Sequence, residues 1–87
     1  MSPINNRAIQ FVFNNDLEGV QNLTIDEIKR PDENGRTAIH AACFKGYSQL
    51  LTIMLQKLGD ESKTVCDTRD NTGRTAVHYA CGEQWEQ

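Results

Sequence analysis

The feature that most constrains this chain is a ten-residue stretch that occurs twice. Residues 34–43 read NGRTAIHAAC and residues 72–81 read TGRTAVHYAC. The second copy begins 38 residues after the first, since 72 − 34 = 38. A stretch that recurs every 20–50 residues or so is typical of proteins built from stacked units, each of which buries its apolar face against a neighbour. The repeat therefore predicts a solenoid of stacked units.

Each copy belongs to a turn followed by a helix. Residues 32–35 (DENG) and 70–73 (DNTG) match D-x-x-G, which favours a type I turn with Asp at the first position and Gly at the fourth. Thr37 and Thr75 are expected N-caps, because a threonine hydroxyl can accept a hydrogen bond from a backbone N–H of the first helical turn. Helices are expected next, over residues 38–45 and from 76 to about 83.

The rest of the first copy's unit contains a second, longer helix. Gly46 interrupts the pattern, and residues 47–58 (YSQLLTIMLQKL) place leucine, isoleucine and methionine on a wide apolar face. Gly59 is expected after the end of this helix, in the left-handed conformation. The mostly polar stretch between Gly59 and Asp70 is interpreted as an extended loop between units.

The N-terminal segment has the form of a unit without the turn. A helix is expected to begin near Ser2 and end near Asn14, and a short second helix should come next, from Leu17 to about Leu23. Residues 24–27 (TIDE) match a capping box. We therefore expect one domain over residues 1–87, divided into a capping unit (1–31), a full unit with an extended loop (32–69) and a truncated unit (70–87).

The repeated motifs resemble those of the ankyrin-repeat family. Residues 37–42 (TAIHAA) and 75–80 (TAVHYA) are similar to the motif T-P-L-H-x-A, with alanine in place of the usual proline. Residues 13–23 (FNNDLEGVQNL) look like the family's G-D-L-E opening. The resemblance implies an all-α, helix-turn-helix solenoid with short, hairpin-like turns. It also implies a structural, hydrogen-bonding role for four motif residues: Thr37, His40, Thr75 and His78.

The same resemblance implies a protein–protein interaction module, an adaptor or scaffold, with no catalytic activity and no cofactor. Partners of such proteins commonly dock on the turn tips and on the inner side of the first helices. By position, this surface comprises Glu33, Asn34, Arg36, Ala41, Phe44, Lys45, Asn71, Thr72, Arg74, Tyr79 and Glu83. Phe44 and Tyr79 are the expected anchors, because aromatic residues dominate interface energetics. The alternative is that both rings pack against an adjacent turn.

A second hypothesis is self-association. Compared with the second unit, the third lacks its long helix, so apolar side chains beside it should be partly bare. We expect these side chains to be covered either by a second chain, which would form a homo-oligomer, or by further residues. The residues expected to contribute are Ile53, Leu58, Val77 and Trp85. For Trp85 the alternative is an exposed terminus.

A third hypothesis is a zinc site. His40 and Cys43, and His78 and Cys81, form two H-x2-C pairs, and Zn²⁺ favours tetrahedral Cys and His ligands. Stacked helices lie about 10 Å apart, however, so four such side chains cannot easily converge on one ion. A Cys–His nucleophile is also disfavoured, because the pattern offers no oxyanion site.

Composition narrows the class of partner. The net charge is −3 and the longest basic run is Lys29-Arg30, so neither nucleic acid nor an anionic membrane is expected to bind. No apolar run reaches the ~18 residues of a membrane span. Three cysteines cannot all pair within one chain, which is typical of a reducing compartment. An intracellular protein is therefore expected, in the cytoplasm or the nucleus.

Overall fold

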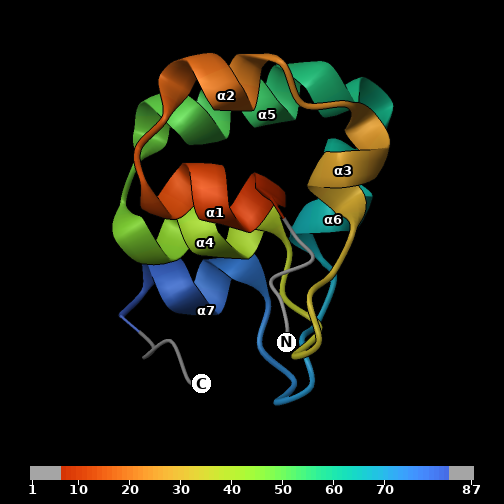
Figure 1. Ribbon diagram of the computed structural model, residues 1–87. Coiled ribbons are helices and arrows are strands. Elements are labelled where there is room, and N and C mark those ends of the chain that lie inside the picture. Colours follow the sequence, from red (N-terminus) through yellow and green to blue (C-terminus); the bar gives the residue numbers. More distant parts are fainter. Residues whose placement is uncertain (1–6, 83–87) are drawn as a thin grey trace.

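The computed structural model of the chain describes residues 7–82, and over this range it consists of helices and turns with no strand (Figure 1). This confirms the all-α solenoid. Within the described range no helix has both the length and the apolar character needed to cross a membrane. The elements in order are α1 Arg7–Phe13, α2 Leu17–Gln21, α3 Ile25–Lys29, α4 Ala38–Lys45, α5 Ser48–Leu58, the 3-10 helix η1 Gly59–Glu61, α6 Ser62–Cys66 and α7 Ala76–Ala80.

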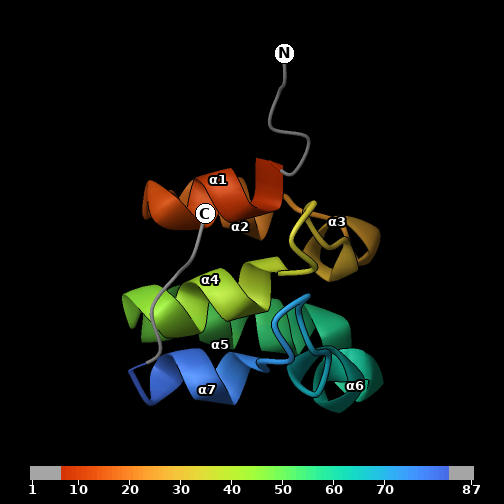
Figure 2. The same ribbon diagram turned by 90° about the horizontal axis from the view of Figure 1, so that it is seen from below.

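The helices are arranged in layers. Figure 2 shows α1, α4 and α7 stacked one above another and running in the same direction. Helices α2 and α5 form a second layer behind this stack, and α3 and α6 both lie at one end of it. We call α1–α3 the first unit, α4–α6 the second unit and α7 with its preceding turn the third unit.

The core lies between these layers. Its apolar side chains come from every α-helix, because each helix is apolar on the face that meets its neighbours. The largest fully buried apolar side chains are Val12, Val20, Ile28, Ile39, Leu50 and Met54. The core is therefore continuous from the first unit into the third.

Helix α1 ends where the sequence predicts, with Phe13 as its last residue. Asn15 comes next at φ +54°, and the Asp16 side chain accepts a hydrogen bond from Gly19 N–H, which begins α2. The predicted capping box is present: Thr24 Oγ1 accepts from Glu27 N–H, and Glu27 Oε1 accepts from Thr24 N–H. This capping box lies at the start of α3. The predicted helix start at Ser2 lies outside the described residues.

The stretch from Gly59 to Asp70 is folded, and the expectation of an extended loop was wrong. It forms η1 and α6, and Val65 of α6 is buried. Lys29 Nζ lies 2.7 Å from Glu61 Oε1 and joins the first unit to this segment. Each of the first two units therefore has a short third helix, and both of these helices lie at the same end of the stack (Figure 2).

Helix α7 is shorter than predicted. It ends at Ala80, and Cys81 and Gly82 form a turn, with Gly82 at φ +112°. The matching helix α4 runs to Lys45 before Gly46 ends it in the left-handed conformation. Cys81 is exposed, whereas the matching Cys43 of α4 is half-buried. The expected continuation to Glu83 lies outside the described residues.

Candidate functional site

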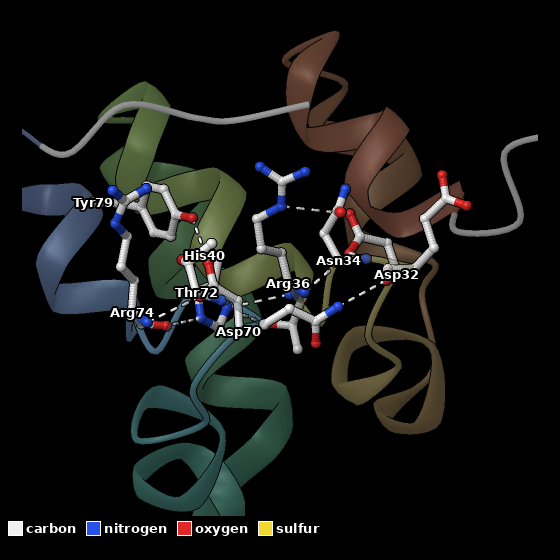
Figure 3. Close-up of polar contacts among 11 residues, drawn as sticks. Asp32, Asn34, Arg36, His40, Asp70, Thr72, Arg74 and Tyr79 are labelled. Carbon is white, nitrogen blue, oxygen red and sulfur yellow. Dashed lines mark hydrogen bonds and ion pairs between the residues drawn. The ribbon is translucent and has the colours of Figure 1, made fainter.

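Two turns lie side by side at one edge of the stack, as Figure 3 shows. We call residues 32–36 the Asp32 turn. Gly35 N–H donates to the Asp32 carbonyl at 3.0 Å, as the D-x-x-G pattern predicts, and Asp32 N–H donates to the Arg36 carbonyl at 2.8 Å. The Asp32 carboxylate accepts from the backbone N–H groups of Asn34 and Arg36 at 2.8 and 2.9 Å. One aspartate therefore holds the whole turn.

The Asp70 turn, residues 70–74, repeats this pattern. The Asp70 carboxylate accepts from the backbone N–H groups of Thr72 and Arg74, both at 2.9 Å, and from the Thr72 hydroxyl at 2.6 Å. Burial alone would raise the pKa of Asp70, but the hydrogen bonds from Thr72, Tyr79 and Arg74 outweigh it and lower that pKa below its ordinary value. Asp70 is therefore an anion that organises this turn, and not a proton donor.

Asn71 joins the two turns into one surface. Its backbone N–H donates to the Asn34 carbonyl at 2.8 Å, and its side-chain amide donates to the Glu33 carbonyl at 3.1 Å. Gly35 lies against it: an added Cβ would come within 2.8 Å of Asn71 Oδ1. The turn tips therefore have a fixed spacing, and the Glu33 and Asn71 side chains face solvent on them.

His40 connects the second unit to the third. Its Nδ1 accepts from the Thr37 backbone N–H at 3.2 Å, which completes a capping box at the start of α4. Because an N–H donates to Nδ1, the ring proton is on Nε2, which lies 3.2 Å from the Arg74 carbonyl. Burial lowers the pKa of His40, so its neutral form is favoured. The motif histidine thus braces its own helix and the next turn together.

His78 repeats only the first half of this arrangement. Its Nδ1 accepts from the Thr75 N–H at 2.9 Å and lies 3.0 Å from the Thr75 hydroxyl, again as a capping box. The side chain is exposed, and no hydrogen bond joins its Nε2 to any residue between 7 and 82. The two histidines therefore differ because, within this range, only His40 has the turn of a further unit packed against it.

Tyr79 lies inside the structure. It is 3% exposed, and its hydroxyl donates to Asp70 Oδ2. Its ring meets the rings of His40 and Phe44 edge-on, with centroids 5.7 and 6.3 Å apart. The expectation of a partner anchor at Tyr79 is thus corrected in favour of the alternative, packing against an adjacent turn. Hydrogen bonding to a buried carboxylate explains why a tyrosine fits there.

Arg36 is also buried, which corrects its expected place on the surface. It is 3% exposed, and its Nε lies 3.7 Å from Asp32 Oδ2. Arg74, the matching residue of the Asp70 turn, is half-buried, and its backbone carbonyl accepts a hydrogen bond from His40 Nε2–H. Figure 3 shows both arginine side chains beside the turns. Ala41, likewise expected on the docking surface, is fully buried.

The other expected contact residues reach solvent. Glu33, Lys45, Asn71 and Thr72 are exposed, and Asn34, Phe44 and Arg74 are half-buried. Lys45 Nζ lies 5.5 Å from the centroid of the Phe13 ring and 6.0 Å from that of Phe44. Phe13 was not part of the predicted surface. Its position as the last residue of α1, matching Phe44 near the end of α4, could have indicated it.

The residues expected to self-associate fall into three groups. Leu58 is buried, which corrects the expectation that it is partly bare. Ile53 is half-buried and packed on the core, and the segment after α5 folds back beside this helix as α6. Val77 is 63% exposed, whereas the matching residue of α4, Ile39, is fully buried. Trp85 lies outside the described residues, as does Glu83.

The H-x2-C pairs do not form a metal site. Both ring nitrogens of His40 are engaged in hydrogen bonds, so neither offers a lone pair to an ion. Over residues 7–82, no group of three or more His, Cys, Asp or Glu side chains has the arrangement to hold a metal. Burial raises the pKa of the Cys43 thiol, which disfavours the thiolate that a nucleophile or a ligand requires.

Comparison with known families adds to this geometry. The sequence model for ankyrin repeats (3 copies) matches residues 7–85, which is most of the chain. No individual curated protein matches it.

Proposed function

This chain belongs to the ankyrin-repeat family, and we propose that it binds a protein partner through the surface formed by its turn tips and the C-terminal ends of α1 and α4. Ankyrin repeats are generally protein–protein interaction modules. Our proposal is finer: this chain acts as an adaptor or scaffold, and contacts come from Glu33, Asn34, Phe44, Lys45, Asn71 and Arg74. Arg36 and Tyr79 support this surface from beneath.

The observation that carries the proposal is the pair of hydrogen bonds from Asn71 to the Asp32 turn. They place the tips of two units at a fixed spacing, with exposed polar side chains on both. A surface that is already ordered loses less conformational entropy when a partner binds. The proposed binding surface is of this kind.

The three-unit division expected from the sequence is part of this proposal, with units over residues 1–31, 32–69 and 70–87. So is an intracellular location, in the cytoplasm or the nucleus. It is supported by Cys43, Cys66 and Cys81, which are all free thiols. Ankyrin repeats are typically non-catalytic, and we propose a binding role without a reaction.

The test is affinity capture from an extract of the source cells with three proteins in parallel. The wild type is compared with Glu33→Arg combined with Phe44→Ala, which alters both parts of the proposed surface. Glu18→Arg is the control, because Glu18 is equally exposed but lies on α2 in the other layer. We expect to capture at least one protein that binds to the wild type and to the control but not to the double variant. If the double variant retains every partner, Glu33 and Phe44 are not part of the binding surface and the proposal is wrong.

Self-association is a second candidate function, and the exposure of Val77 supports it. Val77 matches Ile39 of α4 by position, and Ile39 is fully buried in the stack. We expect the mass measured by sedimentation to rise with concentration, and Val77→Glu to abolish the rise. A mass that stays that of the monomer at all concentrations would remove this candidate.

A further inference from the structure

The tip of the Asp32 turn carries a dipeptide whose covalent structure can change without an enzyme. Asn34 is followed by Gly35, and these two residues form the only Asn-Gly pair among the 87 residues of the sequence. The backbone nitrogen that follows an asparagine can attack the side-chain carbon Cγ and close a five-membered succinimide ring. Glycine favours this attack most, because it has no Cβ to hinder the approach and its backbone rotates freely. Asn34 is therefore the asparagine of this chain that is most prone to react.

The reaction needs only water. A bond forms from Gly35 N to Asn34 Cγ, the bond from Cγ to the side-chain nitrogen breaks, and that nitrogen leaves as ammonia with the proton of Gly35 N–H. Water then opens the ring at one of its two carbonyl carbons. Attack at Cγ gives aspartate, and attack at the backbone carbonyl carbon gives isoaspartate, in which the chain continues through the side chain.

The folded turn opposes ring closure. Gly35 N–H donates to the Asp32 carbonyl at 3.0 Å, and the Asn34 carbonyl accepts from Asn71 N–H at 2.8 Å. Asn34 N–H donates to Asp32 Oδ1 at 2.8 Å (Figure 3). The peptide group between Asn34 and Gly35 is thus held at both its oxygen and its nitrogen. Ring closure requires this group to rotate until its nitrogen meets Cγ, which breaks its hydrogen bonds to Asp32 and Asn71.

Part of this restraint comes from the third unit. Besides its bond to the Asn34 carbonyl, Asn71 donates through its side-chain amide to the Glu33 carbonyl at 3.1 Å, so it holds the peptide groups on both sides of Asn34. Helix α7 packs mainly on α4, and a segment with few packed neighbours opens at a lower free energy than the whole molecule. Opening of the third unit therefore releases the reactive peptide group from Asn71.

We propose that Asn34 is a site of spontaneous deamidation, and that packing of the third unit against the Asp32 turn controls its rate. Both products alter the tip of the turn. Aspartate at position 34 adds a carboxylate directly after Asp32 and Glu33, and like charges repel one another. Isoaspartate lengthens the backbone by one carbon and displaces the carbonyl that Asn71 contacts. Either product weakens the contact between the two turns. The inference is independent of the proposed protein-binding function.

The Asp70 turn supplies a matched control. Thr72 occupies the place of Asn34, and its N–H donates to Asp70 Oδ1 at 2.9 Å, as Asn34 N–H donates to Asp32 Oδ1. Asn34→Thr therefore introduces a residue that the chain itself uses at this position of the turn, and it removes the reactive amide.

The experiment incubates the wild type, Asn34→Thr, Asn71→Ala and the surface control Thr64→Ala at mildly alkaline pH, each folded and in concentrated urea. Peptide mapping by mass spectrometry and chromatography measures aspartate and isoaspartate at each position. In urea, the wild type should convert at Asn34 before any other asparagine. Folded wild type and folded Thr64→Ala should convert about tenfold or more slowly than in urea, because only the open fraction reacts. Folded Asn71→Ala should convert faster than both.

The incubated proteins are then unfolded in urea. The wild type should acquire a fraction with a lower midpoint of unfolding, in proportion to the conversion at Asn34, whereas Asn34→Thr should not. An unchanged midpoint after conversion would refute the weakened contact between the turns.

The rates test the remaining parts of the proposal separately. Conversion at another asparagine ahead of Asn34 in urea would refute the site, and equal rates in the folded and unfolded wild type would refute its protection by the fold. If Asn71→Ala does not fold, wild type in urea below the unfolding transition decides, because its rate should rise there as the third unit opens. A constant rate below the transition would refute control by the third unit.

Discussion

The Nε2–H of His40, in the second unit, donates to the backbone carbonyl of Arg74, in the third, across 3.2 Å. The same ring accepts the Thr37 N–H through Nδ1. One fully buried side chain therefore sets the start of its own helix and the position of the next turn. A hydrogen bond of this kind, between a side chain and a carbonyl 34 residues away, holds consecutive units in register.

Replacement of His40 by alanine is expected to lower the free energy of unfolding by about 2–3 kcal/mol, because it removes two buried hydrogen bonds and leaves the Thr37 N–H without a partner. His78→Ala is the control and should cost less, about 1 kcal/mol, since only the helix cap is lost at an exposed site. Urea unfolding monitored by circular dichroism measures both. Equal losses would contradict the bridging role of His40.

Mild acid is expected to weaken the fold through His40. Burial lowers the pKa of this histidine in the folded chain, so the unfolded chain binds the proton more readily. The stabilisation is therefore complete above the ordinary pKa of about 6.5 and is lost as the pH falls below it. The urea concentration at the midpoint of unfolding should therefore decrease as the pH is lowered from 7.5 to 5.5.

His40→Gln should show a flatter dependence over the same interval, because glutamine does not titrate. Asp70, whose pKa is lowered on folding, acts in the same direction but only below about pH 4–5, where its unfolded form begins to take up protons. If the urea midpoint of His40→Gln depends on pH as steeply as that of the wild type, a group other than His40 causes the loss of stability in acid.

Tyr79→Phe is expected to destabilise the protein by about 1.5–3 kcal/mol, because the Asp70 carboxylate loses a buried hydroxyl donor while the ring contacts remain. Tyr47→Phe serves as control: Tyr47 is half-buried against the core, and no hydrogen bond joins its hydroxyl to a residue of the described range. Thermal unfolding compares the two variants. If Tyr79→Phe is as stable as Tyr47→Phe, the hydrogen bond from Tyr79 to Asp70 does not stabilise the fold.

Two matching glycines test the contact between the turns. Gly35 and Gly73 have φ values of +81° and +85°, so alanine at either site should cost about 1–2 kcal/mol of strain. At Gly35 the added Cβ would also meet Asn71 Oδ1 at 2.8 Å and Asn71 N at 3.0 Å, whereas at Gly73 no atom lies within 4 Å. Gly35→Ala should therefore be the more damaging variant in denaturant titration, and the reverse order would contradict the packing of the two turns.

Val65→Ala tests whether α6 is part of the folded core. Its buried methyl groups lie where the sequence predicts a loop, and their loss is expected to cost about 1–2 kcal/mol. Thr64→Ala, at the exposed neighbouring position, should change the stability by less than about 0.5 kcal/mol. Identical unfolding curves for the two variants would mean that α6 does not contribute to the core.

The repeat allowed the architecture to be predicted, because D-x-x-G turns, N-cap threonines and glycine breaks are local signals that need no tertiary information. Gly46 ends α4, and Thr37 begins it, as the sequence indicates. Helix α6 was missed for the opposite reason. Its five residues, SKTVC, are too few to show a helical period, and only Val65, with Cys66 next to it, in a polar stretch hinted at burial.

The candidate site was predicted less well than the fold. Position in the motif indicates which face a residue occupies, but not what lies above it. Arg36 and Tyr79 belong to the expected surface by position, yet Asp32 and Asp70 draw them inward through an ion pair and a hydrogen bond. Such a partner is known only once the two turns are placed side by side.

The one-sided cover of α7 has a consequence for dynamics. This helix packs mainly on α4, and its other side leaves Val77 in solvent. The third unit should therefore open at a lower free energy than the whole molecule, and its amides should exchange with deuterium before those of α4 and α5. A ligand that bridges both turns would slow this exchange, so that binding at the edge of the stack would be measurable as slower deuterium uptake by the amides of α7.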